Sequence, residues 1–112
     1  MVDASSLRPR FELWLARENM KAANKEGIEI LKAVRDCGSF NEAAKHLGIS
    51  YRHLWKSLTA MEDATGEALV ESRIGGHGGG GTTLTIFAET MIQDFEYLNE
   101  RMTRTAEHEY SR

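Results

Sequence analysis

The segment from Val70 to Thr85 limits the possible folds of this chain more than any other. Two short stretches that can form strands, Leu69–Arg73 and Thr82–Leu84, flank a loop (75–81) in which six of the seven residues are glycine. Glycine destabilises the interior of a helix, and a glycine-rich loop between two short strands is typical of a β-hairpin. The sequence therefore predicts a hairpin over about 69–85 that separates the helices before it from any helix after it.

The length and composition predict one globular domain over residues 1–112. Hydrophobic residues make up 41% of the chain and charged residues 28%, as in ordinary globular proteins. Every apolar run is shorter than the roughly 20 residues that span a bilayer, and the first residues do not resemble a secretory signal. The single cysteine, Cys37, excludes an internal disulfide. We therefore expect a protein of the reducing cytoplasm that has no membrane contact.

The region before residue 39 is expected to contain one strand and one helix. Apolar side chains recur at every second position, at Phe11, Leu13 and Leu15, which suits a half-buried strand over about 10–15. Residues 7, 11 and 14 also share helical spacing, so the start of a helix is the alternative. From residue 24 to 36 the apolar residues have helical spacing, and Gly38 is placed to end that helix.

Residues 39–66 have the pattern of two helices joined by a tight turn. Ser39 and Glu42 fit a capping box, in which the serine hydroxyl accepts from the backbone of the glutamate. Gly48 supplies the turn, and Ser50 is a favourable N-cap for a further helix that Gly66 ends. This order of elements is typical of a helix-turn-helix motif.

The helix after Ser50 has two different sides when its residues are projected at about 100° per residue. The apolar side contains Leu54, Leu58, Met61 and Thr65, with Tyr51 at its edge. The opposite side contains Arg52, Lys56, Thr59 and Asp63, with Trp55 beside them. Recognition helices meet DNA base edges with their first turns, where the two cations lie, so this helix and the hairpin together predict a winged helix-turn-helix. Trp55 and Tyr51 are open to two interpretations, packing against a neighbouring element or contact with DNA.

A long helix is expected after the hairpin, over about 86–105. Thr85 can cap it, and its apolar residues step by 3, 4, 3 and 4, as in the seam of a coiled coil. Because a domain of this size cannot cover the whole apolar seam of the helix, a homodimer is the natural way to bury it. The predicted fold class is mainly α with a small β-hairpin, and its last helix serves dimerisation.

The glycine loop is a candidate contact with phosphate groups. Backbone without Cβ atoms can approach phosphate oxygens closely, and Arg73 and His77 add positive charge. A flexible hairpin tip is one alternative interpretation. A nucleotide-binding loop is another, but the lysine that such a loop requires is absent.

The formal charge of −3 argues against a non-specific DNA-coating protein, which should be basic. The acids gather in the C-terminal tail and around residues 62–67, whereas the candidate reading surface carries cations. The four histidines lack metal-ligand spacing, and no group of residues resembles a catalytic site. We therefore expect no metal, no cofactor and no enzyme activity.

Several motifs resemble known bacterial regulators. Gly38–Phe40 and Leu47–Ser50 resemble the helix-turn-helix of LysR-type regulators. The run Gly48–Arg52 with Trp55, followed by Val70–Arg73 and the glycine loop, is similar to the DNA-binding domain of ModE-type, molybdate-responsive transcription regulators. The resemblance implies a winged helix-turn-helix that dimerises through the last helix and the N-terminal strand. The Ser-Ala-Arg-Asn oxyanion motif of that family is absent, so the resemblance implies a stand-alone form without a molybdate site.

The expected function is that of a sequence-specific, double-stranded DNA-binding transcription regulator acting as a homodimer. The alternative is a winged-helix module that binds other proteins and not DNA. The candidate DNA-contacting residues are Ser50, Tyr51, Arg52, Trp55, Lys56, Thr59, Arg73, Gly76, His77, Gly78 and Gly79. The candidate dimer residues are Phe11, Leu13, Leu15, Ala88, Met91, Phe95, Leu98 and Met102.

Overall fold

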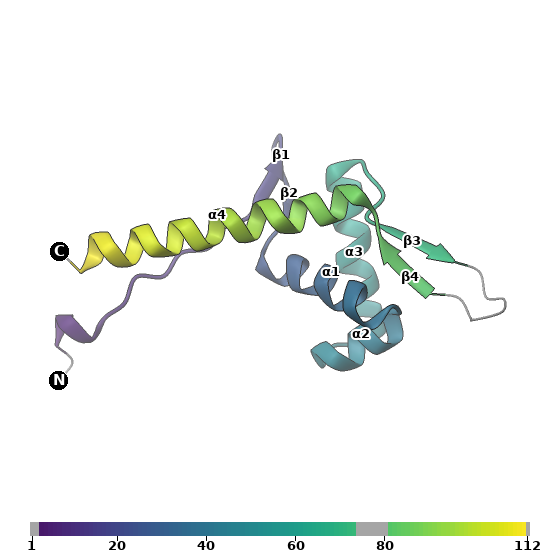
Figure 1. The fold of residues 1–112 in the computed structure, drawn as a ribbon, viewed down its shortest axis with the longest axis horizontal. Helices are drawn as coiled ribbons and strands as arrows, with labels where there is room; N and C mark the ends of the chain where they lie inside the picture. The colour runs from purple at the N-terminus through teal and green to yellow at the C-terminus, as the bar shows by residue number, and fades with distance from the viewer. Residues whose placement is uncertain (1–2, 74–80, 112) are drawn as a thin grey trace.

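The computed structural model describes residues 3–73 and 81–111, which form a mainly α-helical body with two small hairpins (Figure 1). In chain order the elements are η1 (Ala4–Ser6), β1 (Leu15–Arg17), β2 (Met20–Ala23), α1 (Lys25–Cys37), α2 (Phe40–Leu47), α3 (Tyr51–Thr65), β3 (Val70–Arg73), β4 (Gly81–Leu84) and α4 (Ile86–Tyr110). Helices α1, α2 and α3 pack together, and α4 crosses this body and continues beyond it (Figure 1). The predicted fold class is confirmed.

Local capping signals set the limits of the helices. The hydroxyl of Ser39 accepts from the Glu42 amide at 3.1 Å and starts α2, and the hydroxyl of Ser50 accepts from the His53 amide at 3.0 Å and starts α3. The Glu42 carboxylate lies 3.6 Å from the Lys45 ammonium group. Gly48 has a φ of 68°, a left-handed conformation that a residue with a Cβ atom adopts at a cost. The predicted helix-turn-helix is therefore confirmed.

The hydrophobic core lies on both sides of α1. One cluster joins α1 to α3 and α4 through residues that include Leu31, Leu58 and Ile92. The second cluster joins α1 to α2 and to the start of α3 through residues that include Val34 and Leu54. Since Leu54 and Leu58 are both fully buried, the apolar side of α3 is fixed against the body and its opposite side faces outward.

The hairpin after α3 is attached to the helix-turn-helix. Strands β3 and β4 pair antiparallel, with Val70 opposite Leu84 and Arg73 opposite Gly81. The amide of Thr82 donates to the carbonyl of Gly38 at 2.9 Å, so the β4 strand is bonded to the turn between α1 and α2. The loop between these strands, at 74–80, lies outside the described residues.

The prediction of a strand over 10–15 is wrong. The strand begins at Leu15 and pairs with β2 through a tight turn, in which Glu18 has a φ of 55°. Leu13 and Leu15 do pack against the core, which explains the alternating pattern. A strand also requires a hydrogen-bonding partner, and here the partner is the segment that follows the turn, which places the paired residues after position 14.

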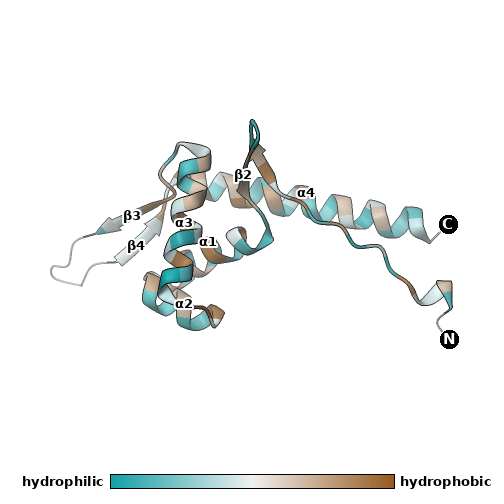
Figure 2. Ribbon diagram, turned by 180° about the vertical axis from the view of Figure 1, so that it is seen from behind, coloured by the Kyte–Doolittle hydropathy of each residue, from teal (hydrophilic) through white to brown (hydrophobic). Residues whose placement is uncertain are grey.

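Helix α4 is longer than the predicted range of 86–105 and reaches Tyr110. The Arg104 guanidinium lies 2.7 Å from the Glu100 carboxylate, one turn earlier, and such pairs stabilise an exposed helix. Along the C-terminal half of α4, hydrophilic and hydrophobic residues alternate in bands (Figure 2). Each helix among the described residues is too short or too polar to span a lipid bilayer.

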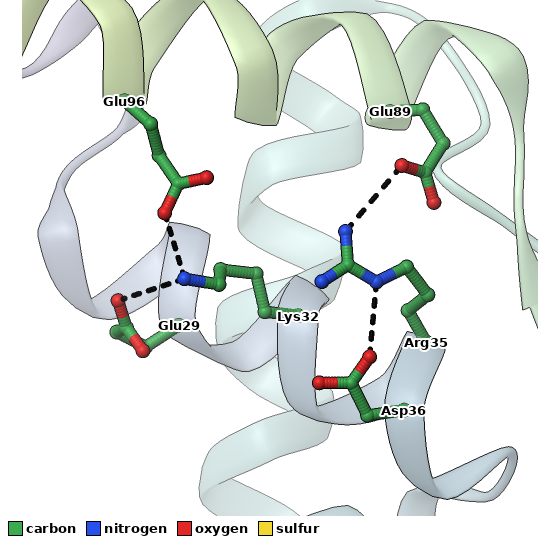
Figure 3. A network of polar contacts seen from close by, with 6 residues as sticks. All are labelled: Glu29, Lys32, Arg35, Asp36, Glu89 and Glu96. Carbon is green, nitrogen blue, oxygen red and sulfur yellow. Dashed lines mark hydrogen bonds and ion pairs between the residues drawn. The ribbon is translucent and has the colours of Figure 1, made fainter.

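The first half of the predicted dimer seam is occupied from within the chain. Ala88, Met91 and Phe95 are buried in the core that α4 shares with α1 and α3, so these predicted dimer residues expose little surface to a second copy. Two ion pairs also join this stretch to α1, since Lys32 and Arg35 of α1 bind Glu96 and Glu89 of α4 (Figure 3). The heptad-like spacing is real, but its first half faces this chain's own body.

Candidate nucleic-acid interface

The outward side of α3 carries two cations in its first two turns. Arg52 and Lys56 are both exposed and lie one helical turn apart, opposite the buried Leu54 and Leu58. Thr59, a turn further on, is half-buried. The structure therefore brings Arg52, Lys56 and Thr59 together on one side of the helix, as the sequence predicts.

These cations are not neutralised by neighbouring acids. Among the residues that the structure describes, Arg52, Lys56 and Arg73 form no ion pair, whereas Lys32 and Arg35 do. The Glu62 carboxylate, near the end of α3, accepts from the Leu69 amide at 2.8 Å. The positive charge at the start of α3 is therefore available to an anionic ligand.

Tyr51 and Trp55 both pack against one aromatic ring of α2. The Phe40 ring centroid lies 6.3 Å from that of Tyr51 and 5.8 Å from that of Trp55. About half of each side chain stays exposed, 48% for Tyr51 and 49% for Trp55. Packing against a neighbouring element, one of the two interpretations from the sequence, accounts for the buried half. Contact with DNA through the exposed half stays a prediction.

Two further candidates lie at the ends of elements. The Ser50 hydroxyl accepts from the backbone as the N-cap of α3, and as a hydroxyl it still has a proton to donate. Arg73 is exposed at the end of β3 and pairs with Gly81 of β4. The residue after Gly81, Thr82, is the one whose amide donates to Gly38 in the α1–α2 turn. The candidates Gly76, His77, Gly78 and Gly79 lie outside the described residues.

One acid at this surface, Glu26, is not indicated by any sequence pattern. The Nε2 atom of His53 lies 2.7 Å from the Oε1 atom of Glu26, which belongs to the first turn of α1. Both side chains are exposed. The two residues are 27 positions apart, and no local pattern in the sequence links them.

A family model described as "Bacterial regulatory helix-turn-helix protein, lysR family" matches residues 26–89, which is more than half of the chain. The chain belongs to this family. The match runs from the first turn of α1 to the first turn of α4 and so includes α3 and both strands of the hairpin. The LysR-type part of the resemblance is confirmed.

Curated relatives include transcriptional regulators named ModE. The chain is 40% identical over 83 residues to "Transcriptional regulator ModE" of Haemophilus influenzae, covering 74% of the chain and 31% of that protein. It is 37% identical over 76 residues to "DNA-binding transcriptional dual regulator ModE" of Escherichia coli, covering 68% of the chain and 29% of that protein. The ModE-type resemblance of the helix-turn-helix is confirmed, and the chain spans about a third of the length of these relatives.

Solved structures of similar fold come from CbnR. The chain matches a structure titled "Crystal structure of CbnR_DBD-DNA complex" with a TM-score of 0.59 and 23% identity, covering 77% of this chain and 93% of that one. It also matches "Crystal structure of CbnR, a LysR family transcriptional regulator" with a TM-score of 0.57 and 24% identity, covering 75% of this chain and 27% of that one. At this level of identity the similarity concerns the fold.

Proposed function

We propose that this chain binds double-stranded DNA sequence-specifically and regulates transcription in the bacterial cytoplasm, with α3 in the major groove. The observation that carries the proposal is the pair of unneutralised cations, Arg52 and Lys56, on the outward side of the first two turns of α3. Guanidinium and ammonium groups in that position can donate to guanine edges or to phosphate oxygens. Membership of the LysR-type helix-turn-helix family and the names of the ModE relatives support this function.

The hairpin extends the proposed contact surface along the DNA backbone. The bond from Thr82 to Gly38 holds β4 against the α1–α2 turn, which fixes the direction in which the hairpin leaves the body. Arg73, at the far end of β3, then adds a third cation on the path of the backbone. Because the net charge of the chain is −3, non-specific affinity should be modest, and specificity should come from a few placed contacts.

We also propose that the chain acts as a homodimer, through a smaller surface than its sequence suggests. Phe11, Leu98 and Met102 line a groove of about 380 Å³ beside the outer half of α4, and each side chain is at least 40% exposed. Leu13 and Leu15 pack against the core, so they contribute less. A symmetric pair would present two α3 helices to half-sites about one helical turn or more apart.

A binding selection tests the DNA-binding proposal. The wild-type chain is incubated with a pool of random-sequence duplexes, and the retained duplexes are sequenced and titrated by fluorescence anisotropy. We expect a common motif and an affinity that falls steeply as salt rises. Arg104→Ala on α4 is the matched control, since it removes an exposed arginine outside the proposed contact surface and should leave the affinity unchanged. Absence of any retained motif would overturn the proposal.

Light scattering after gel filtration tests the homodimer. Leu98→Glu and Met102→Glu place a charge in the groove and should convert the dimer to a monomer. Gln93→Glu adds the same charge at an exposed position of α4 outside the groove and should leave the dimer intact. A wild-type chain that is monomeric at micromolar concentration, or a Leu98→Glu variant that remains dimeric, would contradict this surface.

The acidic balance favours a second candidate, a module that binds another protein through the exposed apolar side chains. Ile86, the most exposed of these at 86%, stands at the start of α4 close to the hairpin. In this case Arg52→Ala would leave binding unchanged, and salt up to about 0.2 M would have little effect on affinity. The anisotropy titration described above therefore separates the two candidates.

A further inference from the structure

We propose that Glu26 is a positioning residue for DNA binding, and that it holds the His53 ring so that its second nitrogen meets a phosphate oxygen. The proposal rests on the DNA-binding function proposed above. It extends the contact surface from α3 to the flank beside the first turn of α1. The geometric basis is the 2.7 Å contact between His53 Nε2 and Glu26 Oε1.

The backbone fixes both members of this pair. Asn24 caps α1 by accepting from the Gly27 amide at 3.0 Å, which sets the first turn that carries Glu26. Ser50 caps α3 by accepting from the amide of His53 itself at 3.0 Å. Each side chain therefore leaves a turn whose backbone is already held, and the pair joins the start of one helix to the start of the other.

The contact with Glu26 leaves one nitrogen of the ring for a ligand. When Nε2 donates to the carboxylate, the remaining nitrogen of the ring is Nδ1. Within the described ranges, Nδ1 has no hydrogen-bond partner, and half of the His53 side chain is exposed. An imidazolium donates from both nitrogens, so the ring can bridge Glu26 and a phosphate.

His53 also lies beside the proposed reading surface. Lys56 lies three positions after His53, so the two side chains are neighbours on α3. Tyr51 and Trp55 occupy the other flank, where they pack on Phe40 of α2. The first turns of α3 would therefore offer cations outward, aromatic rings on the α2 side and the His53–Glu26 pair on the α1 side.

Removal of Glu26 should change the DNA affinity in one direction if charge alone matters and in the other if Glu26 orients His53, so the two explanations can be separated. A carboxylate close to DNA repels phosphates, so its removal should tighten binding if charge alone mattered. If Glu26 orients His53, its removal should weaken binding, because the ring then loses its fixed orientation. The exposed pair contributes little to folding, so thermal stability should barely change in either case.

The experiment measures the affinity of Glu26→Ala, Glu26→Gln, His53→Ala and the double variant Glu26→Ala/His53→Ala for the duplex that the wild-type chain selects. We expect Glu26→Ala to weaken binding by about three- to ten-fold, the range of one hydrogen bond. Glu26→Gln keeps an oxygen that can accept from Nε2 and should restore most of the affinity. In the His53→Ala background Glu26→Ala should have no further effect on affinity. Removal of His53 should also lower the slope of log affinity against log salt by about 1.

Each other result is decisive. Tighter binding by both Glu26 variants would mean that the carboxylate acts only by repulsion, and an equal loss with or without His53 would mean that Glu26 does not act through the ring. Either result, or unchanged affinity in all four variants, overturns the role of Glu26 while DNA binding stands. If the wild-type chain selects no duplex, both proposals fall together.

Discussion

Helices α1 and α3 both present cations, but the two sets have different surroundings. On α1, Lys32 lies 2.7 Å from Glu96 and Arg35 lies 3.5 Å from Glu89, so acids of α4 neutralise both cations. On α3, Arg52 and Lys56 have no acid within ion-pair distance among the described residues. The number of cations on a helix therefore says little about DNA binding. The position of the acids decides which cations remain available.

The strongest test of this contrast is Arg52→Ala against Arg35→Ala. Loss of Arg52 should cost about 1–3 kcal/mol of DNA-binding free energy and relax the choice of one base pair, if the guanidinium reads a base edge. Loss of Arg35 should leave DNA affinity unchanged, because that guanidinium is bound to Asp36 and Glu89. Anisotropy titrations with the selected duplex and its single-base variants measure both effects. An equal loss of affinity in the two variants would remove the distinction between the helices.

Lys56→Ala should have a smaller effect of a different kind. An ammonium group that meets a phosphate contributes equally to all sequences, so affinity should fall uniformly across duplexes. The slope of log affinity against log salt should fall by about 1. The matched variant Lys32→Ala removes a lysine that is bound to Glu96, and its slope should equal that of the wild-type chain. A change in base preference in Lys56→Ala would instead assign Lys56 to a base edge.

The sequence predicts the helix-turn-helix well because its signals are local. Ser39, Ser50 and Thr85 each cap a helix within three residues, and Gly48 takes the left-handed turn conformation that the motif requires. The outward side of α3 follows directly from helical spacing once Leu54 is buried. These features need no knowledge of distant parts of the chain.

The wrong or missed features all depend on which segment lies against a residue, and local spacing does not show this. The alternation around Leu13 indicates extended chain packed on the core, but it cannot show which segment supplies the hydrogen bonds of a strand. The spacing of Met91 and Phe95 predicts an apolar stripe, but it cannot show whether the stripe meets this chain's own body or a second copy. The contact between Glu26 and His53 needs the packing of α1 against α3, which spacing alone does not give.

The lysine of the α1–α4 contact makes stability depend on pH. The hydrogen bond to Glu96 raises the pKa of Lys32 above its ordinary value of 10.5, so the folded state holds this proton more tightly than the unfolded state. The stabilisation is therefore complete below the unfolded pKa and is lost as pH rises through the folded pKa. Lys32→Met should cost about 0.2–1 kcal/mol at pH 7. Urea unfolding should show that the difference from wild type shrinks above pH 10.5. An undiminished difference there would mean that packing of the lysine stem, not its charge, stabilises the contact.

The smallest expected effect is the coupling between Arg35 and Glu89. The guanidinium is shared with Asp36 at 3.0 Å, the distance to Glu89 is 3.5 Å, and both side chains are more than a third exposed. Water and salt screen such a pair, so a double-mutant cycle with Arg35→Ala and Glu89→Ala should give about 0.2–0.5 kcal/mol in low salt. At about 1 M salt the coupling should fall towards zero, since the screening length is then only about 3 Å. A coupling above about 1 kcal/mol, or one that ignores salt, would mean that ion pairs rather than buried side chains such as Ile92 fix α4 to the body.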